Sequence, residues 1–330
     1  MIKIGINGLG RIGRLVLRAA LEDKDVEIAL INTPASSEVV AHLLKYDSIH
    51  GIANFECDYS EGGVNINGKK IPIFSCRDPL ELSSGNIDVM LECSGKFNKR
   101  TEAASHIKAG AKKVIVSAPC ENADRTIVMG VNHNSLSSEH DVISIGSCTT
   151  NALAPIAKII NDNFSIENGY VTTIHAYTGD QNIVDNSHKD IRRARCAGMS
   201  MIPTKTGAAE ALKLVLPELE GKIFGSAIRV PTPNVSMLDM VFNLSKPASK
   251  ETVNKVINEA ANGEMRDIIS VAKAKLVSVD FNHSPYSSIF DPFETCIISD
   301  KTIRLVSWYD NEWGFAKRMI DAAKLIYEQI

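Results

Sequence analysis

Apolar residues in the first half of the chain form short continuous runs that alternate with segments of helical spacing. Runs of this length are typical of strands buried on both faces, and their alternation with helices indicates a parallel sheet covered by helices. The predicted strands are 3–8, 26–31, 87–93, 111–119 and 141–146, and the predicted helices are 11–21 and 39–44.

After residue 160 the apolar residues alternate with polar ones or fall in β-branched segments that lie close together along the chain. This pattern predicts a second domain built on a mixed, largely antiparallel sheet. Its predicted strands are 170–178, 222–231, 236–245, 275–281, 293–299 and 302–310, its helices are 207–216 and 249–262, and a final helix carries an apolar stripe at Phe315, Met319, Ala322, Ala323 and Ile326. The polar stretch 178–200 is longer than ordinary loops, which favours a functional role.

The charge and the cysteines argue against several classes of protein. The formal net charge of −3 and the pI near 6.3 give no field that would attract nucleic acid or an anionic membrane. No apolar run approaches the roughly 18 residues that span a bilayer, and the N-terminus enters a strand without a signal peptide. The seven cysteines are widely spaced, without CxxC or HExxH, so we expect reduced thiols, no metal site and a cytosolic protein.

The stretch GLGRIG at 8–13 follows the first predicted strand and opens the first predicted helix. In that position Gly8 permits a tight turn, Gly10 lets the backbone approach a pyrophosphate, and Gly13 lets helix and strand pack closely. The amides of Arg11 and Ile12 would face the phosphates at the helix N-terminus. The stretch therefore predicts a dinucleotide site, and the alternative is an ordinary strand–helix turn.

A dinucleotide site of this kind usually has an acidic residue at the end of the second strand, where it binds the ribose 2′-OH. Here that end reads ALINTPASSE, with Thr33 near the expected position and Glu38 as the next carboxylate. A carboxylate would repel the 2′-phosphate of NADP, whereas a threonine can donate a hydrogen bond to it. The alternatives are a register shift or an NAD site that lacks the acid.

Cys148 stands in the stretch GSCTTN, after a predicted buried strand and before an apolar run with helical spacing. A thiolate at a helix N-terminus is stabilised by the partial positive charge there, and cofactors bind at the C-terminal edge of parallel sheets. His175, in the strand TTIHAYT, is the candidate base. The alternative is a buried structural cysteine, which suits Cys93 and Cys296 better because they lie inside apolar strands.

The motifs SCTTN, HAYT, DIRRAR, PTKTGAA, RVPTPNVS and WYDNEWG occur in this order along the chain. Together they resemble the phosphorylating glyceraldehyde-3-phosphate dehydrogenase family, and the resemblance extends over essentially the whole chain. SCTTN with WYDNEWG is highly specific, whereas GLGRIG alone is not. The resemblance implies an α/β fold with a Rossmann-type parallel-sheet domain that binds NAD(P), formed by residues 1–147 and 314–330, and a catalytic α+β domain of residues 148–313.

The resemblance also implies roles for individual residues. Cys148 matches the nucleophile, and His175 matches the residue that activates its thiol and moves protons. The pocket for the substrate's own phosphate matches Thr178, Asp180 and Arg229. The site of inorganic phosphate matches Ser147, Thr149, Thr206, Gly207 and one arginine of RRAR, for which the spacing favours Arg192 and leaves Arg193 open. Further cofactor contacts match Arg77, Ser117 and Asn311, the last at the nicotinamide carboxamide.

The implied reaction is the reversible oxidative phosphorylation of D-glyceraldehyde 3-phosphate through a cysteine thioester, with hydride transfer to NAD(P) and inorganic phosphate as co-substrate. The family's homotetramer implies that a partner subunit orders the loop 178–200. A related alternative is the dehydrogenation of erythrose 4-phosphate without added phosphate. An alternative of another class is a non-catalytic nucleotide- or RNA-binding protein, against which the Cys148–His175 pair and the acidic pI weigh.

The sequence departs from the family at four positions. Thr33 replaces the usual Asp, and Ser187 replaces a proline common in NAD-specific members, so we expect the protein to use both NAD and NADP. Phe315 replaces a tyrosine that packs against the nicotinamide, and Ile145 replaces an asparagine before the nucleophile. These two differences affect nicotinamide packing and thiol placement, not the reaction.

Overall fold

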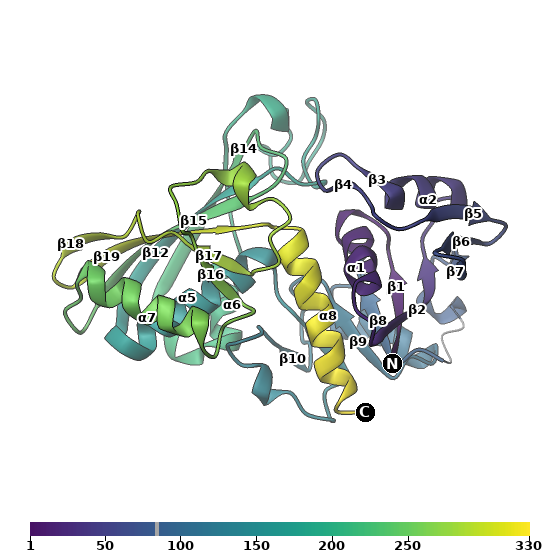
Figure 1. Ribbon diagram of the computed structural model, residues 1–330, viewed down its shortest axis with the longest axis horizontal. Helices are drawn as coiled ribbons and strands as arrows, with labels where there is room; N and C mark the ends of the chain where they lie inside the picture. Colours follow the sequence, from purple (N-terminus) through teal and green to yellow (C-terminus); the bar gives the residue numbers. More distant parts are fainter. Residues whose placement is uncertain (83–85) are drawn as a thin grey trace. The chain divides into compact units, whose positions relative to one another are not determined.

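The computed structural model describes residues 1–82 and 86–330. These residues form two units (Figure 1). The first unit contains Met1–Ile127, Asn134–Gly146 and Ala316–Ile330, and the second contains Val128–His133 and Ser147–Phe315. Helix α8 (Trp313–Tyr327) begins in the last residues of the second unit and continues in the first.

The described residues of the first unit form a nine-stranded sheet. In spatial order its strands are β10 (Arg125–Thr126), β11 (Val142–Ser144), β9 (Lys113–Val116), β8 (Val89–Glu92), β1 (Ile2–Asn7), β2 (Val26–Asn32), β7 (Lys69–Phe74), β6 (Gly63–Ile66) and β5 (Cys57–Ser60). Neighbours from β10 to β7 run parallel, while β7, β6 and β5 pair antiparallel. The predicted parallel sheet is therefore confirmed, with an antiparallel edge that the sequence pattern missed.

Short helices and a strand pair complete this unit. They are α1 (Arg11–Leu21), α2 (Ser37–Lys45), α3 (Arg100–Ala103), α4 (Ser105–Lys108), the 3₁₀ helix η1 (Pro79–Glu81), and the pair β3 (Tyr46–Asp47) and β4 (Gly51–Ile52). The 3₁₀ helix η2 (His133–Ser135) begins with the last residue of a segment of the second unit and continues in the first. The bounds of α1 are those that the sequence predicts, because an apolar stripe covers one face of this helix and glycines precede it.

The turn from β1 to α1 depends on two glycines. Gly8 has a φ of +90°, and a Cβ there would lie 2.5 Å from the backbone of Ser94. A Cβ at Gly13 would lie only 2.0 Å from the carbonyl oxygen of Gly8, so only glycine fits at this position. A Cβ at Gly10 would meet nothing within 4 Å, which leaves the backbone there open to a ligand.

The second unit contains an eight-stranded mixed sheet. In spatial order its strands are β13 (Ile202–Thr204), β14 (Ile223–Val230), β12 (Ile166–Ala176), β15 (Ser236–Leu244), β19 (Thr302–Tyr309), β17 (Ser288–Phe290) and β16 (Ile269–Val271), and β18 (Cys296–Ser299) also pairs with β19. Only β12 with β14 and β16 with β17 are parallel pairs. The predicted mixed, largely antiparallel sheet is confirmed.

The other elements of this unit are α5 (Cys148–Phe164), α6 (Ala208–Val215), α7 (Lys250–Asn262), and the 3₁₀ helices η3 (Ala197–Met199), η4 (Pro217–Leu219) and η5 (Ser278–Phe281). The strand predicted at 275–281 is wrong, because η5 occupies most of this segment. The Asp280 carboxylate accepts a hydrogen bond from the Val277 amide, and Val277 and Val279 are exposed, so the β-branched residues have no neighbouring strand to pair with.

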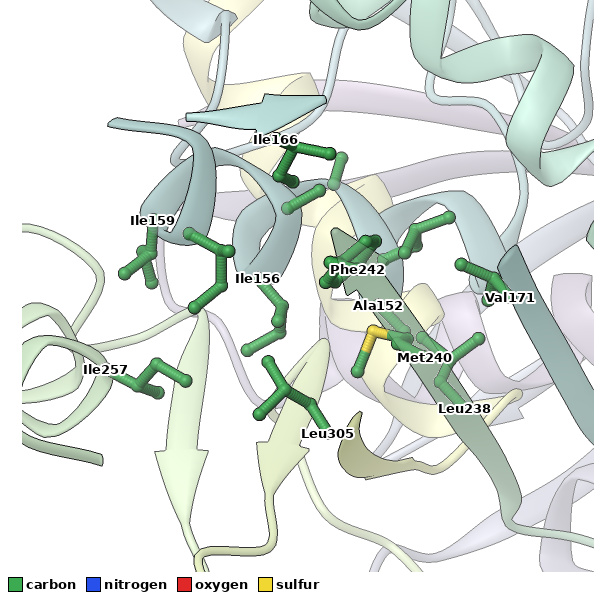
Figure 2. Close-up of a cluster of buried hydrophobic side chains, with 14 of the residues drawn as sticks. Ala152, Ile156, Ile159, Ile166, Val171, Leu238, Met240, Phe242, Ile257 and Leu305 are labelled. Carbon is green, nitrogen blue, oxygen red and sulfur yellow. The ribbon is translucent and has the colours of Figure 1, made fainter. Parts of the chain in front are cut away.

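Helix α5 forms the centre of the core in the second unit (Figure 2). Its residues Ala152, Ile156 and Ile159 are buried together with Met240 and Phe242 of β15. The Ser147 side chain caps the helix by accepting a hydrogen bond from the Thr150 amide at 3.1 Å. Cap and core packing together fix the position of the first helical residue.

Among the described residues, no helix combines the length and hydrophobicity that a membrane-spanning segment requires.

We predict that Gly13→Ala destabilises the first unit by about 3 kcal/mol or more, because the new methyl group overlaps the Gly8 carbonyl. Gly10→Ala is the matched control, with an expected cost below about 1 kcal/mol, since no atom lies near its Cβ. Urea unfolding of both variants measures the difference. Equal stabilities would contradict the close approach at Gly13.

Candidate active site

Cys148 and His175 lie side by side in the second unit. The Cys148 sulfur is 3.6 Å from His175 Nε2. Cys148 is the first residue of α5, and His175 lies near the end of β12. The structure thus brings together two residues that are 27 positions apart and that the sequence singles out as nucleophile and base.

The strand β12 presents His175 by simple alternation. Val171, Thr173 and His175 are buried on one face, whereas Tyr170 on the opposite face is half-exposed. Val171 belongs to the same core as α5, so the buried face of β12 is the one that α5 covers. A side-chain period of two therefore directs His175 towards the start of the helix.

Arg229 lies next to His175 because β14 and β12 pair in parallel with these two residues in register. Its Nη1 donates to the Ala176 carbonyl at 3.0 Å and lies 2.9 Å from His175 Nδ1. His175 Nδ1 is itself 2.7 Å from the same carbonyl, and a hydrogen bond to this oxygen requires the proton on Nδ1. We adopt this tautomer, in which Arg229 Nη1 donates to the carbonyl and not to Nδ1, and the Nε2 lone pair faces Cys148. Arg229 Nε is buried and has no hydrogen-bond partner in the described part of the chain.

Burial and the Arg229 guanidinium lower the pKa of His175 to about 3. Burial raises the pKa of the Cys148 thiol, while the Arg229 cation and hydrogen bonds from Thr149 act in the opposite direction. The sequence suggested that the helix start lowers the pKa of Cys148. In the structure this pKa is raised instead, because the effect of burial is larger than the effects that lower it. A neutral thiol beside a neutral imidazole is the arrangement of a nucleophile with its general base.

Tyr309 joins this site from β19, and sequence reasoning assigned it no role. Its ring meets the His175 ring edge-on, with centroids 5.9 Å apart and an interplanar angle of 79°. Its hydroxyl lies 2.9 Å from Thr149 Oγ1 and 2.8 Å from Thr173 Oγ1. The only signal in the sequence was its place in the motif WYDNEWG.

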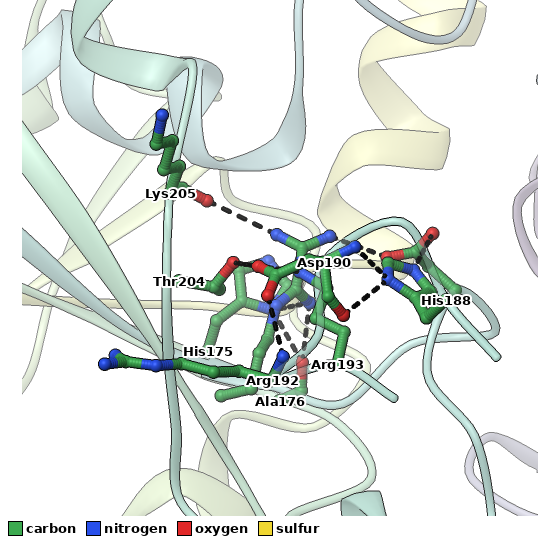
Figure 3. A network of polar contacts seen from close by, with 10 residues as sticks. His175, Ala176, His188, Asp190, Arg192, Arg193, Thr204 and Lys205 are labelled. Carbon is green, nitrogen blue, oxygen red and sulfur yellow. Dashed lines mark hydrogen bonds and ion pairs between the residues drawn. The ribbon is translucent and has the colours of Figure 1, made fainter. Parts of the chain in front are cut away.

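Figure 3 shows a polar cluster that includes part of the loop 178–200. Arg193 binds Asp180 at 2.6 Å, Thr204 Oγ1 at 3.1 Å and the Lys205 carbonyl at 3.3 Å. Arg192 is exposed, and its side chain points away from this cluster. Arg193 therefore belongs to this cluster through its side chain, whereas the side chain of Arg192, the arginine that spacing favoured, does not.

The remaining residues predicted for phosphate binding lie at helix starts or loop turns. Thr206 Oγ1 accepts from the Ala208 amide at 3.2 Å, and Gly207 is the N-cap of α6. The Thr178 carbonyl accepts from the Gln181 amide at 2.9 Å. No hydrogen bond within the described ranges joins the Thr178 or Thr206 side chain to Arg229.

A cavity of about 860 Å³ opens beside the β1–α1 turn in the first unit. Four residues that the sequence predicts for cofactor binding line it, namely Gly8, Gly10, Thr33 and Arg77. The other lining residues are Asn7, Leu9, Asn32, Pro34, Ser75, Cys76, Cys93, Ser94, Lys96 and Phe97. Among all the described residues that line the cavity, Arg77 and Lys96 are cationic and none is acidic. This charge suits a polyanionic ligand.

The floor of this cavity rests on a buried polar network at the carboxyl ends of β1, β2 and β8. Asn32 donates to the Asn7 side chain at 2.7 Å, and the Asn7 amide donates to the Glu92 carboxylate. Glu92 also pairs with His106 at 2.9 Å and accepts from the Ser94 amide at 2.7 Å. Sequence reasoning missed these residues, because their partners lie on strands far apart in the chain.

The other predicted cofactor residues lie outside the set that lines the cavity. Arg11 pairs with Asp47, which holds the pKa of that carboxyl far below its usual range despite its burial. The Asn311 side-chain oxygen accepts from Ser236 Oγ at 2.8 Å. Ser187 is exposed. Ile12, Gly13 and Ser117 complete the predicted set, and Gly13 acts through the tight turn.

All seven cysteines are free thiols. Within the part of the chain that the structure describes, no three His, Cys, Asp or Glu side chains are grouped to hold a metal ion.

Two family models match the chain. The model described as glyceraldehyde 3-phosphate dehydrogenase, NAD binding domain, matches residues 2–100, and the C-terminal domain model matches residues 147–311. The chain is similar to a glyceraldehyde-3-phosphate dehydrogenase of Geobacillus stearothermophilus, with 50% identity over 328 residues and 98% of both chains covered. It is also 49% identical to the enzyme of that name from Priestia megaterium, again with 98% of both chains covered. A third, from Xanthobacter flavus, is 49% identical over 98% of this chain and 97% of its own.

We predict that His175→Asn slows alkylation of Cys148 by iodoacetamide at pH 7 by about tenfold, because a protonated thiol then lacks its base. Peptide mass spectrometry resolves Cys148 from the other thiols. His42→Asn, at an exposed position in the first unit, is the matched control and should leave the rate unchanged. An unchanged rate in His175→Asn would show that the imidazole does not activate the sulfur.

Proposed function

Because the chain belongs to the glyceraldehyde-3-phosphate dehydrogenase family, we propose that it catalyses the reversible oxidative phosphorylation of D-glyceraldehyde 3-phosphate to 1,3-bisphosphoglycerate. The observation that carries the proposal is the contact of Cys148 with a neutral His175, flanked by the Arg229 cation. A nucleophile, a base and a buried cation are the groups that oxidation of a phosphorylated aldehyde through a thioester requires.

The reaction begins when His175 Nε2 takes the proton from Cys148 and the thiolate adds to the aldehyde carbon. The backbone amide of Cys148 stabilises the oxygen that gains charge, and His175 returns its proton to this oxygen, which becomes a hydroxyl. The nicotinamide, when bound, accepts the hydride from this carbon. His175 takes the hydroxyl proton as the carbonyl re-forms, and Cys148 then carries a thioester. A phosphate oxygen attacks the thioester, so the acyl phosphate leaves and the Cys148 sulfur is restored.

Two arginines suit the two phosphates of the reaction. We assign Arg229, with Thr178 and Asp180, to the phosphate of the substrate, since its Nε is a buried donor without a partner. We assign Arg193 to inorganic phosphate, because Thr204 and the Lys205 carbonyl hold its guanidinium. Ser147, Thr149, Thr206 and Gly207 complete the second site in this proposal.

We also propose that the enzyme uses NADP as well as NAD. Thr33 lines the cavity of the first unit together with Arg77, and no described residue of the lining is acidic. A hydroxyl and a guanidinium in the same cavity can bind a 2′-phosphate, whereas the usual carboxylate would repel it. Arg77 therefore supplies the cationic partner that sequence reasoning did not find for this phosphate.

A homotetramer and a cytosolic location are further parts of the proposal. Five large apolar side chains of the segment 183–201 are mostly exposed, namely Ile183, Val184, Ile191, Met199 and Met201. Exposed apolar groups gathered in one segment mark a protein interface. Sedimentation that shows a stable, active monomer would contradict the tetramer, and cell fractionation tests the location.

We predict that Cys148→Ser abolishes turnover but leaves cofactor binding intact, because a hydroxyl is a far weaker nucleophile than a thiol at this position. Cys296→Ser, at an exposed thiol, is the matched control and should keep full activity. A fully active Cys148→Ser variant would refute the assignment of Cys148 as the nucleophile. A wild-type protein that binds the cofactor but shows no turnover would favour the non-catalytic alternative.

In the wild type, omission of inorganic phosphate should stop steady-state turnover of glyceraldehyde 3-phosphate, because nothing else then releases the thioester rapidly. Undiminished turnover without phosphate, and a higher kcat/KM with erythrose 4-phosphate, would favour the alternative dehydrogenase.

We predict that Thr33→Asp lowers kcat/KM for NADP by about tenfold or more and leaves NAD little changed. At an effective dielectric of about 20, two unit charges roughly 4 Å apart repel by about 4 kcal/mol, and a third of this already gives a tenfold effect. Thr33→Val removes the hydroxyl without adding charge and separates the two effects. A wild-type preference for NAD above about a hundredfold, or an unchanged NADP efficiency in Thr33→Asp, contradicts the proposal.

A further inference from the structure

Ser236 joins two parts of the second unit through one hydroxyl. Its Oγ accepts a hydrogen bond from the Ala176 amide at 3.1 Å and donates to the Asn311 side-chain oxygen at 2.8 Å. Ala176 follows the candidate base His175 at the end of β12, and Ser236 begins β15. Ser236 is only 1% exposed. Its hydroxyl therefore links the strand that carries the base to the side chain of Asn311 inside the protein.

The hydrogen bonds of Ser236 determine which way the Asn311 amide faces. A hydroxyl has one proton and two lone pairs. The Ala176 amide uses one lone pair, and the Tyr309 hydroxyl, a further partner of Ser236, can use the other. The Ser236 proton is then directed to Asn311. This makes the Asn311 oxygen the acceptor and turns the NH2 group of the amide away from Ser236.

Asp310 fixes the backbone next to Asn311. One oxygen of its carboxylate accepts from the amides of Glu312 and Trp313, each at 2.8 Å, and the other accepts from the Asn234 side chain at 2.9 Å. Asp310 itself is only 2% exposed. The backbone and the side chain of Asn311 are therefore both held in place by the protein, which is the condition for a precise binding contact.

The NH2 group of Asn311 has no hydrogen-bond partner among the described residues, although the residue is only 5% exposed. An unused donor at such a position is unfavourable unless a ligand supplies an acceptor. Asn311 lies two residues after Tyr309, whose ring contacts His175, so this donor stands near the reactive pair. A neutral amide suits a neutral carboxamide oxygen, whereas phosphate is better served by arginine.

We propose that Ser236 is a positioning residue for the hydride acceptor, and that its hydroxyl orients the Asn311 amide to donate to the carboxamide oxygen of a bound nicotinamide. This inference rests on the proposed function, which assigns a nicotinamide cofactor to the enzyme. Hydride transfer requires the nicotinamide ring in one orientation. Since Ser236 also binds the Ala176 amide, the same hydroxyl ties this orientation to the strand that carries the base.

The test compares two ligands in Ser236→Ala and in the wild type: NADH, and ADP-ribose, which lacks the nicotinamide. Alanine removes the hydroxyl and leaves the Asn311 amide free to turn. We expect the Kd of NADH, measured by its fluorescence, to rise by about tenfold. The Kd of ADP-ribose, measured by calorimetry, should stay within about twofold, because this ligand has no group for Asn311 to hold.

Ser307→Ala is the matched control. Ser307 is also a fully buried serine in a strand of this sheet, and its hydroxyl bonds to Ser288 instead. This variant should change the Kd of neither ligand. Equal rises for NADH and ADP-ribose in Ser236→Ala would show that the hydroxyl has only a structural role, and an unchanged Kd of NADH would show that it does not orient the amide for the cofactor.

Two variants at Asn311 test the orientation of the amide. Asn311→Asp keeps an oxygen for Ser236 and replaces the donor by a second oxygen, so the Kd of NADH should rise by about tenfold or more. An unchanged or lower Kd would overturn the assigned orientation. Asn311→Ala should also weaken NADH, and addition of Ser236→Ala should weaken it no further, because both changes remove the same donor. A further tenfold loss would show that Ser236 acts on the cofactor by another route.

Alkylation of Cys148 by iodoacetamide reports on the base in the same variants. Its rate should stay within about twofold in Ser236→Ala, since His175 keeps its contact with the Ala176 carbonyl. A tenfold loss would assign Ser236 to the base rather than to the cofactor. If Ser236→Ala does not fold, Asn311→Asp decides through the outcomes given above. Failure of the proposed function is distinguishable, because the wild type would then not oxidise glyceraldehyde 3-phosphate, whereas both Kd values are measured without aldehyde.

Discussion

The packing of α5 against the sheet of the second unit is the constraint on which the site depends. Ala152 and Ile156 are buried with Met240 and Phe242, so the helix cannot slide or rotate without opening the core. Cys148 is the first residue of this helix, and its position follows from that packing. His175 is held equally firmly, because β12 pairs on both sides with β14 and β15. The reactive pair therefore stands on rigid elements rather than on loops, which preserves its geometry.

The electrostatics of the pair follow from the same burial. Removing the sulfur and the imidazole from water favours the neutral form of each, and Arg229 adds to this effect at His175. At Cys148 the Arg229 cation opposes the effect of burial, because it lowers the pKa of the thiol and favours the thiolate. One guanidinium thus supports both states of the reaction, an unprotonated base before proton transfer and an anionic sulfur during it.

The sequence predicts the regular parts of the fold and the reactive pair, because these depend on local patterns. The bounds of α1 follow from an apolar stripe after a glycine turn, and His175 is found through its place in a strand with polar neighbours. Segment 275–281 shows the opposite case, since a β-branched pattern forms a strand only where another strand is available to pair with it. Strands of three residues, such as β13, are too short for any periodicity to show.

A sequence pattern also does not predict in which direction a side chain of a loop points. Arg192 and Arg193 are adjacent and identical in type, and only the partners Asp180 and Thr204 distinguish them. The place of Tyr309 in the site is not predicted from the sequence for a related reason. An aromatic residue in a strand is typical of a core, and the hydroxyl that it contacts on Thr149 is 160 positions away.

In the proposed phosphate site, the ion pair of Arg193 with Asp180 makes anion binding an exchange reaction. Because the carboxylate already occupies the guanidinium, an incoming phosphate must displace it, and the net affinity is a difference between two similar contacts. Asp180 is half-exposed, so the displaced pair is worth only about 0.2–1 kcal/mol, a weakening of at most about fivefold. In return the arginine is already ordered when the anion arrives, and the returning carboxylate hastens its departure. The proposed co-substrate site therefore favours rapid release of phosphate over tight binding.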